Sequence, residues 1–183
     1  MPLTYETIKT TATTFILANN PSPTNTPQKS LLNSLVSPSF TISFGHKYFT
    51  STTPHLQHPL DFDGFMAHQM RMTPLLARWR AVVKDCFVDV EKGVAVVVSE
   101  FFMTPRRGGK GGGDGDGDEE TVVNEIVWFV EVEEGGVVGR VVEWVDGVAA
   151  GRLGEIFRGR RGGCEGWVVG LWGCGWIWVF DGL

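Results

Sequence analysis

The chain has 183 residues, of which 43% are hydrophobic and 20% charged, and its formal charge at pH 7 is -5. This length and balance suit one domain with its own core and exclude full-length disorder, and the acidic charge gives no basic surface for nucleic acid. The sequence begins without the features of a signal peptide and contains no apolar run of about 18 residues. We therefore expect a soluble, cytoplasmic protein with no membrane partner.

The first part of the sequence predicts helices on either side of one strand. Residues 5–17 place apolar side chains at helical spacing, and a second short helix follows Thr26, a suitable N-cap. Residues 40–44 alternate between apolar and polar side chains, which is typical of a half-buried strand. A polar loop over residues 50–59 leads to a third helix, roughly residues 61–76, with a broad apolar stripe.

The later part of the sequence predicts strands. Residues 81–90 and 94–103 are rich in β-branched and aromatic side chains and are joined by a short turn that contains glycine. Residues 121–132 and 137–145 form a second pair of this kind, and residues 149–157 predict a short closing helix. No helix lies between the late strands to make a crossover, so the order favours an α+β fold with an antiparallel sheet over a parallel α/β fold.

Two segments do not fit this plan. Residues 105–120 form a hairpin connection rich in glycine and aspartate, which we expect to be flexible. The tail, residues 158–183, is rich in glycine and tryptophan but has neither a helical nor a strand period. Two interpretations of the tail stay open: it covers apolar surface or drives association, or it is translated non-coding sequence and not a natural terminus. The folded domain is predicted to span residues 1–157.

Several motifs resemble one known family. They are SPSFTISFGHKYF, DFDGFMAHQMRMTPLL and a pair of strands in which Asn124-Glu125 begins the first, while Glu143 and Asp146 end the second. Over residues 5–157 the chain resembles fungal proteins of the NTF2-like (SnoaL-like) superfamily. The resemblance implies a cone, in which N-terminal helices pack on a curved antiparallel sheet around an apolar pocket. Proteins of this fold include dehydratases, isomerases, polyketide cyclases, epoxide hydrolases and plain binding domains.

Acid–base side chains in such a pocket are the usual equipment for isomerisation, dehydration or cyclisation without a cofactor. Burial moves a carboxyl pKa toward neutrality, and histidine can shuttle protons. The candidate catalytic residues carry carboxyl or imidazole groups, and the candidate substrate-binding residues are aromatic or begin a strand. The two sets are His46, His68, Glu143 and Asp146, and Phe15, Phe44, Phe65, Asn124, Glu125 and Trp128.

Each candidate also has a structural alternative. We expect His68 and Asp146 to face one pocket from opposite walls, where together they can take a proton from one atom of a substrate and return it at another. In the alternative, His68 is a core histidine and Asp146 caps the helix that begins near Val148. Asn124 is expected to tie backbone segments together or to orient a neighbour.

The strand over residues 124–132 carries large apolar side chains on both faces. Ile126 and Trp128 share one face with Asn124, and Phe129 shares the other with Glu125. The alternation leaves open which face lines the pocket. In dimeric relatives the outer face of the sheet packs on a partner sheet, so we expect a homodimer through that face.

Other motifs do not predict a site. His55 and His58 lie in a proline-flanked loop without further ligands, so no metal is predicted. The acidic residues from Asp114 match part of a calcium loop but lack the glycine that its turn requires. The run GGKGGG lacks phosphate-loop spacing, and the run RGRRGG is interpreted as a solvated tail. The cysteines form no CxxC pair, and Cys86 is expected in the core.

We therefore predict a cofactor-independent isomerase, cyclase or dehydratase that acts on a small, mostly apolar metabolite. The rival prediction is a non-catalytic domain of the same fold that binds a small molecule or forms a dimer. An enzyme is expected to direct two or more titratable side chains into one enclosed pocket, whereas a binding domain needs none.

Overall fold

The computed structural model describes residues 2–21, 28–45, 47–51, 53–106 and 120–159. The flexible connection expected at residues 105–120 and the tail expected at residues 158–183 lie almost wholly outside these ranges. Within the described residues, none of the helices has the length and apolar character that a membrane span requires.

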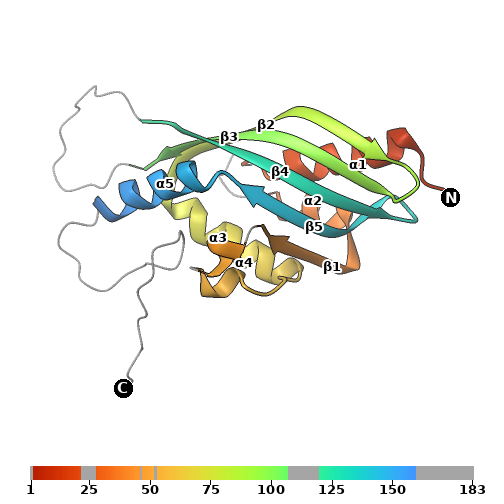
Figure 1. Ribbon diagram of the computed structural model, residues 1–183, viewed down its shortest axis with the longest axis horizontal. Coiled ribbons are helices and arrows are strands. Elements are labelled where there is room, and N and C mark those ends of the chain that lie inside the picture. Colours follow the sequence, from red (N-terminus) through yellow and green to blue (C-terminus); the bar gives the residue numbers. More distant parts are fainter. Residues whose placement is uncertain (1, 22–27, 46, 52, 107–119, 160–183) are drawn as a thin grey trace, which may run out of the picture.

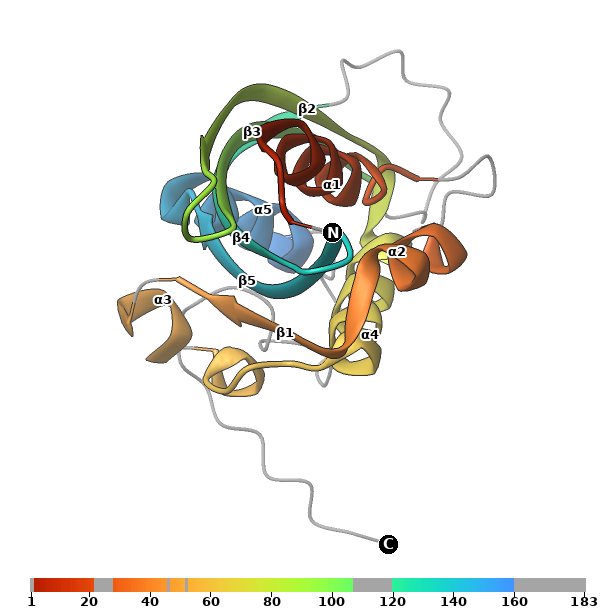
Figure 2. The ribbon, with the colours of Figure 1, turned by 90° about the vertical axis from the view of Figure 1, so that its right-hand side faces the viewer.

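One curved sheet is built from five strands, which are β1 Val36–Phe44, β2 Leu76–Asp89, β3 Val94–Pro105, β4 Val122–Glu133 and β5 Val137–Val145. Their order across the sheet is β1-β5-β4-β3-β2. The four later strands pair as antiparallel neighbours, as the sequence predicts. Gly93 and the pair Gly135 and Gly136 have positive φ and make two of the turns. Figure 2 shows the strands β2 to β5 curling around the N-terminal helix, which gives the sheet its cone shape.

The edge strand β1 corrects the prediction of an entirely antiparallel sheet. It runs parallel to β5, with Thr41 beside Arg140 and Phe44 beside Glu143. Hairpin signals identify only strands that are neighbours in the sequence, whereas β1 and β5 are about a hundred residues apart. A connection of that length can return the chain in the same direction, so the sheet is mixed.

The two longer N-terminal helices begin at side-chain caps. α1 (Tyr5–Leu17) agrees with the predicted helix and starts where Thr4 accepts a hydrogen bond from the N–H of Thr7 at 3.2 Å. α4 (Phe62–Met72) starts where Asp61 accepts a hydrogen bond from the N–H of Gly64 at 2.8 Å. The remaining helices are α2 Lys29–Leu35, α3 Lys47–Ser51 and α5 Gly147–Gly159.

The end of the third predicted helix is corrected. α4 stops at Met72, because the chain then enters a 3-10 turn, Thr73–Leu75, whose Pro74 lacks the N–H that a helix needs. β2 consequently begins at Leu76, well before the strand predicted at residues 81–90.

Two further details of the N-terminal part differ from the sequence prediction. The polar loop expected at residues 50–59 contains the end of α3 and a 3-10 turn, Pro54–Leu56. The N-cap expected at Thr26 lies outside the described residues. α2 begins with Gln28 at the cap position, and the Gln28 side chain makes no capping hydrogen bond.

The core lies between α1 and the concave face of the sheet. The buried face of α1 carries Ile8, Phe15 and Ile16, which have no exposed surface. Phe15 packs against Phe40 of β1 and Phe65 of α4, with ring centroids 5.9 and 6.1 Å away. Burial of such large apolar side chains, at roughly 25 cal/mol per Å² of apolar surface, is the main stabilising contribution to a fold of this size. α5 lies at the opposite end of the sheet from α1 and packs against β3 and β4 (Figure 1).

Candidate functional site

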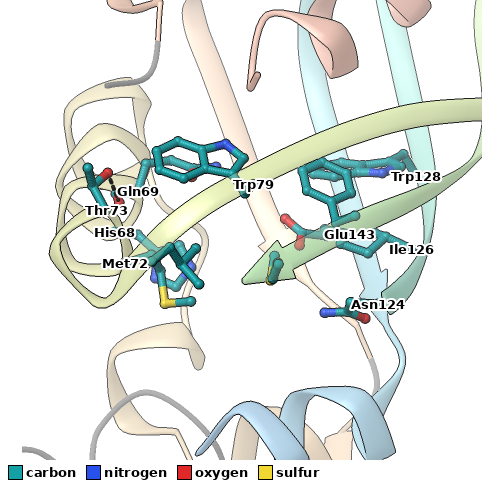
Figure 3. A pocket seen from close by; sticks show the side chains of 12 residues that line it. His68, Gln69, Met72, Thr73, Trp79, Asn124, Ile126, Trp128 and Glu143 are labelled. Carbon is teal, nitrogen blue, oxygen red and sulfur yellow. Dashed lines mark hydrogen bonds between the residues drawn. The ribbon is translucent and has the colours of Figure 1, made fainter. Parts of the chain in front are cut away.

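A cavity lies between α4 and the inner face of the sheet (Figure 3). Its volume is about 550 Å³ when the mouth open to solvent is included. The walls are mostly apolar and come from α4, the turn after it and strands β2 to β5. The apolar lining residues are Met72, Leu76, Trp79, Phe101, Met103, Ile126 and Trp128, and the polar ones are His68, Gln69, Thr73, Asn124 and Glu143.

Among the described residues that line this cavity, Glu143 carries the only carboxyl group. The alternation of β5 turns it to the inner face, where it is flanked by Trp128 of β4 and Phe44 of β1. Burial raises the pKa of the Glu143 carboxyl to about 8. Within the described residues the structure shows no hydrogen bond or ion pair to this carboxyl group. At pH 7 it is therefore mostly protonated, and it points across the cavity toward α4 (Figure 3).

His68 stands on the opposite wall, on the inward face of α4, and only 9% of its surface is exposed. Burial first, then the positive charges of His55 and Arg71, lower the pKa of its imidazole to about 4. The ring is neutral at pH 7 and packs on Phe44, with the ring centroids 5.1 Å apart. Its Nδ1 atom is buried without a hydrogen-bond partner.

Asn124 supplies the third polar group of the cavity. It lies on β4, fully buried, and its Oδ1 atom accepts a hydrogen bond from the backbone N–H of Asp146 at 3.1 Å. That bond fixes the orientation of the amide, so the Nδ2 group points into the cavity (Figure 3). Nδ2 is buried and has no hydrogen-bond partner among the described residues.

The other polar side chains of the lining are already engaged. The indole N–H of Trp79 donates to the backbone carbonyl of Asn19, and that of Trp128 donates to the hydroxyl of Ser99, both at 2.8 Å. Gln69 donates to the Asn19 side chain at 3.1 Å, and the Thr73 hydroxyl donates to the backbone carbonyl of Gln69, also at 3.1 Å. The two tryptophans therefore offer the cavity their ring surfaces and not their N–H groups.

Three unpaired groups of different character consequently share one apolar cavity. Glu143 is a protonated acid, His68 a neutral imidazole, and Asn124 an amide that donates hydrogen bonds. An acid and a base on facing walls can move a proton between two atoms of a molecule held between them. Within the described residues, no group of three or more His, Cys, Asp or Glu side chains could hold a metal ion.

The structure assigns Asp146 a different place from the expected one. It follows β5 directly and does not line the cavity. Its Oδ1 atom accepts hydrogen bonds from the N–H groups of Val148 and Ala149, at 2.8 and 3.3 Å, and so caps the first turn of α5. The cavity therefore brings His68 together with Glu143 and not with Asp146.

The remaining predicted residues divide between the cavity, the core and the outer face. Trp128 and Asn124 line the cavity, and Phe44 contacts the ring of His68. Glu125 is exposed on the outer face beside Glu100, because it follows the inward Asn124 on an alternating strand. Two of the expected substrate-binding aromatics, Phe15 and Phe65, belong to the core and do not line the cavity, because they pack on each other. His46 lies outside the described residues.

Sequence reasoning missed several residues of the lining. Met72 lies four positions after His68 and so on the same face of α4, and that spacing was a usable signal. Gln69 and Thr73 lie one and five positions after His68, and no helical spacing marked them. No comparable signal marked Trp79 and Phe101, which come from separate strands and meet only in the folded sheet.

Several solved structures of known proteins share this architecture. PrhC from Penicillium brasilianum NBRC 6234 is 13% identical, with a TM-score of 0.66 over 85% of this chain and 91% of that one. The BvnE pinacolase from Penicillium brevicompactum is 14% identical, with a TM-score of 0.62 over 85% and 94%. A protein from Jannaschia sp. CCS1, assigned as a SnoaL-like polyketide cyclase, is 14% identical, with a TM-score of 0.54 over 78% and 90%.

No family model and no curated protein matches the sequence. The class that the fold defines is an α+β cone with a cavity between its helices and a curved sheet. More particularly, the fold is the NTF2-like fold. Identities of this size establish the fold alone, so the chemistry has to be argued from the cavity itself.

Proposed function

We propose that this protein is a cofactor-independent isomerase, cyclase or dehydratase that acts on a small, mostly apolar metabolite. One observation carries the proposal: a protonated carboxyl group, a neutral imidazole and an amide donor, all unpaired, line one apolar cavity. A pinacolase and a protein assigned as a polyketide cyclase share the fold, which supports this class of reaction.

The proposed chemistry is a proton transfer with no change of oxidation state. Glu143 gives its proton to an oxygen of the substrate while His68 takes a proton from a neighbouring carbon or oxygen, directly or through a water. A later return of the two protons, at the same or other atoms, completes an isomerisation or a ring closure. In a dehydration the protonated oxygen departs as water with the proton from Glu143, and the proton held by His68 then passes to Glu143, directly or through a water, which restores the starting state. The apolar walls exclude solvent, which keeps the transferred protons on the substrate and on these two side chains.

The active protonation state combines a protonated Glu143 with a neutral His68. With pKa values of about 8 and about 4, this state dominates between those two pH values. Activity is expected to fall as pH rises through about 8, since Glu143 then loses the proton it donates. It is also expected to fall as pH drops through about 4, since His68 is then protonated and cannot accept another proton.

A non-catalytic binding domain is the second candidate. The observation that favours it is the packing of His68 against Phe44, with Nδ1 buried, which is also how a core histidine is held. An imidazole with a pKa of about 4 is, in addition, a weak base at neutral pH.

Metabolite profiling after deletion of the gene distinguishes the two candidates. For an enzyme, one compound accumulates and an isomer or dehydrated derivative of it disappears. Reintroducing the wild-type gene should restore the product, whereas Glu143→Gln and His68→Gln should not. Glu125→Gln, the same carboxyl-to-amide change on the outer face, is the matched control and should restore it. Full restoration by both cavity variants, with each protein present at wild-type level, would contradict the enzyme proposal.

A further inference from the structure

Proton transfer between Glu143 and His68 leaves one polar group of the cavity without a role. The Nδ2 group of Asn124 is buried and unpaired, while its Oδ1 atom is held by the backbone of Asp146. A buried donor without a partner is costly, and a purely structural role explains only the Oδ1 half of this amide. A hydrogen-bond acceptor inside the cavity would complete the bonding of this amide.

Asn124 and Glu143 occupy separate points on the sheet wall. Glu143 lies beside Trp128 in the register of the sheet, and Asn124 comes four residues before Trp128 on the same face of β4. At about 3.3 Å per residue, roughly 13 Å of strand separates the position of Asn124 from that of Glu143. The two side chains can lean toward each other, so a ligand atom bound to Glu143 and another bound to Asn124 would lie on the order of 10 Å apart. One oxygen atom is thus too small to contact both side chains.

The wall between these two points is apolar. Ile126 lies between Asn124 and Trp128 on the inner face, and Trp128 has its N–H bound to Ser99. Trp79 likewise offers only its ring surface, since its N–H is bound to the Asn19 carbonyl. A ligand that spans the two points therefore needs a hydrocarbon middle.

We infer that the ligand is an elongate molecule with an apolar ring skeleton and a carbonyl oxygen at each end, one at Glu143 and the other bound by the Asn124 amide. The inference rests on the proposed function for the Glu143 end and adds Asn124 as the residue that selects the substrate at the other end. Dicarbonyl compounds of two or more fused or linked rings are the class that fits. An analogue without the second carbonyl leaves the Nδ2 donor unsatisfied and binds less tightly.

A matched pair of probes tests this inference by calorimetry. Bicyclohexyl-4,4′-dione carries a ketone at each end, and 4-cyclohexylcyclohexanone has the same skeleton with one ketone. The wild-type protein is expected to bind the diketone about ten-fold more tightly, as one further buried hydrogen bond would give. Asn124→Leu, which removes the donor, should bind both probes with similar affinity.

Two further measurements separate binding from folding. The melting curve of Asn124→Leu shows whether this variant is folded, so that a lost preference can be assigned to the missing donor. Glu125→Gln, next to Asn124 but on the outer face, should keep the ten-fold preference. Equal affinity of the wild-type protein for both probes, including no measurable binding of either, would overturn the inference, as would a preference retained by folded Asn124→Leu.

The result of this binding test does not depend on the result of the test of catalysis. Glu143→Gln still donates a hydrogen bond, so it should keep the preference for the diketone even though it loses the proton. Suppose that the protein prefers the diketone, and that its Glu143→Gln and His68→Gln variants still restore the metabolite profile. That combination would contradict the proposed function and support the Asn124 contact.

Discussion

The two faces of the sheet use similar residues for opposite purposes. On the inner face, Ile126 and Trp128 are almost fully buried, and the few polar groups beside them are either paired or turned into the cavity. On the outer face, Phe129 and Trp144 are 41% and 46% exposed, with ring centroids 6.5 Å apart. Apolar character alone therefore does not distinguish a binding wall from an interface. Buried polar atoms without a partner do, such as Asn124 Nδ2 on the inner face of the sheet and His68 Nδ1 on the helix opposite it.

The largest expected effect contrasts the same change on the two faces. Glu143→Gln removes the cavity proton and keeps the shape, so turnover of the metabolite identified by profiling should fall by about 100-fold or more, as loss of a general acid does. Glu125→Gln on the outer face should leave turnover within about two-fold of wild type. Rates of product formation by the purified variants, compared at equal folded concentration, measure this, and equal rates for both would end the distinction between the faces.

The outer face is expected to form the homodimer. The apolar side chains cross the sheet in two rows of register partners, one from Phe87 to Val142 and one from Val98 to Trp144. An apolar patch of this kind is costly in water. Light scattering at micromolar concentration should give twice the chain mass, and Phe129→Lys should give the monomer mass. Val148→Lys, at an exposed position on α5, is the control and should stay dimeric. A monomer mass for the wild type would contradict the prediction.

The free energy of unfolding should depend on pH because of the Glu143 carboxyl group on the inner face. The pKa of Glu143 is raised from its ordinary value to about 8 in the folded protein, so the folded state holds a proton that the unfolded state has released. The contribution of this carboxyl is full below pH about 4.5 and is lost as pH rises toward 8, at a cost on the order of a few kcal/mol. Glu143→Gln should therefore unfold at a higher temperature than wild type at pH 8, and the difference should shrink toward pH 5. A difference in melting temperature that is constant across this range would contradict the assignment.

The smallest expected effect concerns Asp146, which serves the fold and not the cavity. Asp146→Ala removes the cap of α5 and should lower stability by about 1 kcal/mol, a few degrees in melting temperature. Turnover per folded molecule should survive, because the carboxylate does not line the cavity. Melting curves and rates on the same preparation check both statements. A 100-fold loss of turnover at unchanged stability would contradict this prediction and show that Asp146 takes part in catalysis.

Most of the fold could be predicted because its signals are local. The apolar spacing of residues 5–17, the hairpin turns and the alternation of the late strands each concern neighbours in the sequence. The parallel contact of β1 with β5 has no local signal. Nor does alternation tell which face of β4 points inward, since that depends on where α1 and α4 pack.

The site was predicted less completely, for a related reason. Two carboxyl groups close together, Glu143 and Asp146, could each have entered the cavity, and only the end of β5 at Val145 decides between them. Asp146 precedes α5, and its carboxylate accepts hydrogen bonds from N–H groups in the first turn of that helix. His68 could be found from the apolar stripe of α4, whereas the place of Glu143 in the cavity could be known only from the register of three strands.

The parallel contact between β1 and β5 also determines when the site can exist during synthesis. Phe44 is made early, but its neighbour Glu143 emerges from the ribosome about a hundred residues later, so this contact is among the most non-local in the protein. Until β5 is complete, β1 has no partner in the sheet, and the carboxyl group of the cavity has not been translated. Folding of the site is thus tied to the last strand, and a nascent chain that has already formed the hairpin of β2 and β3 still exposes an unpaired edge.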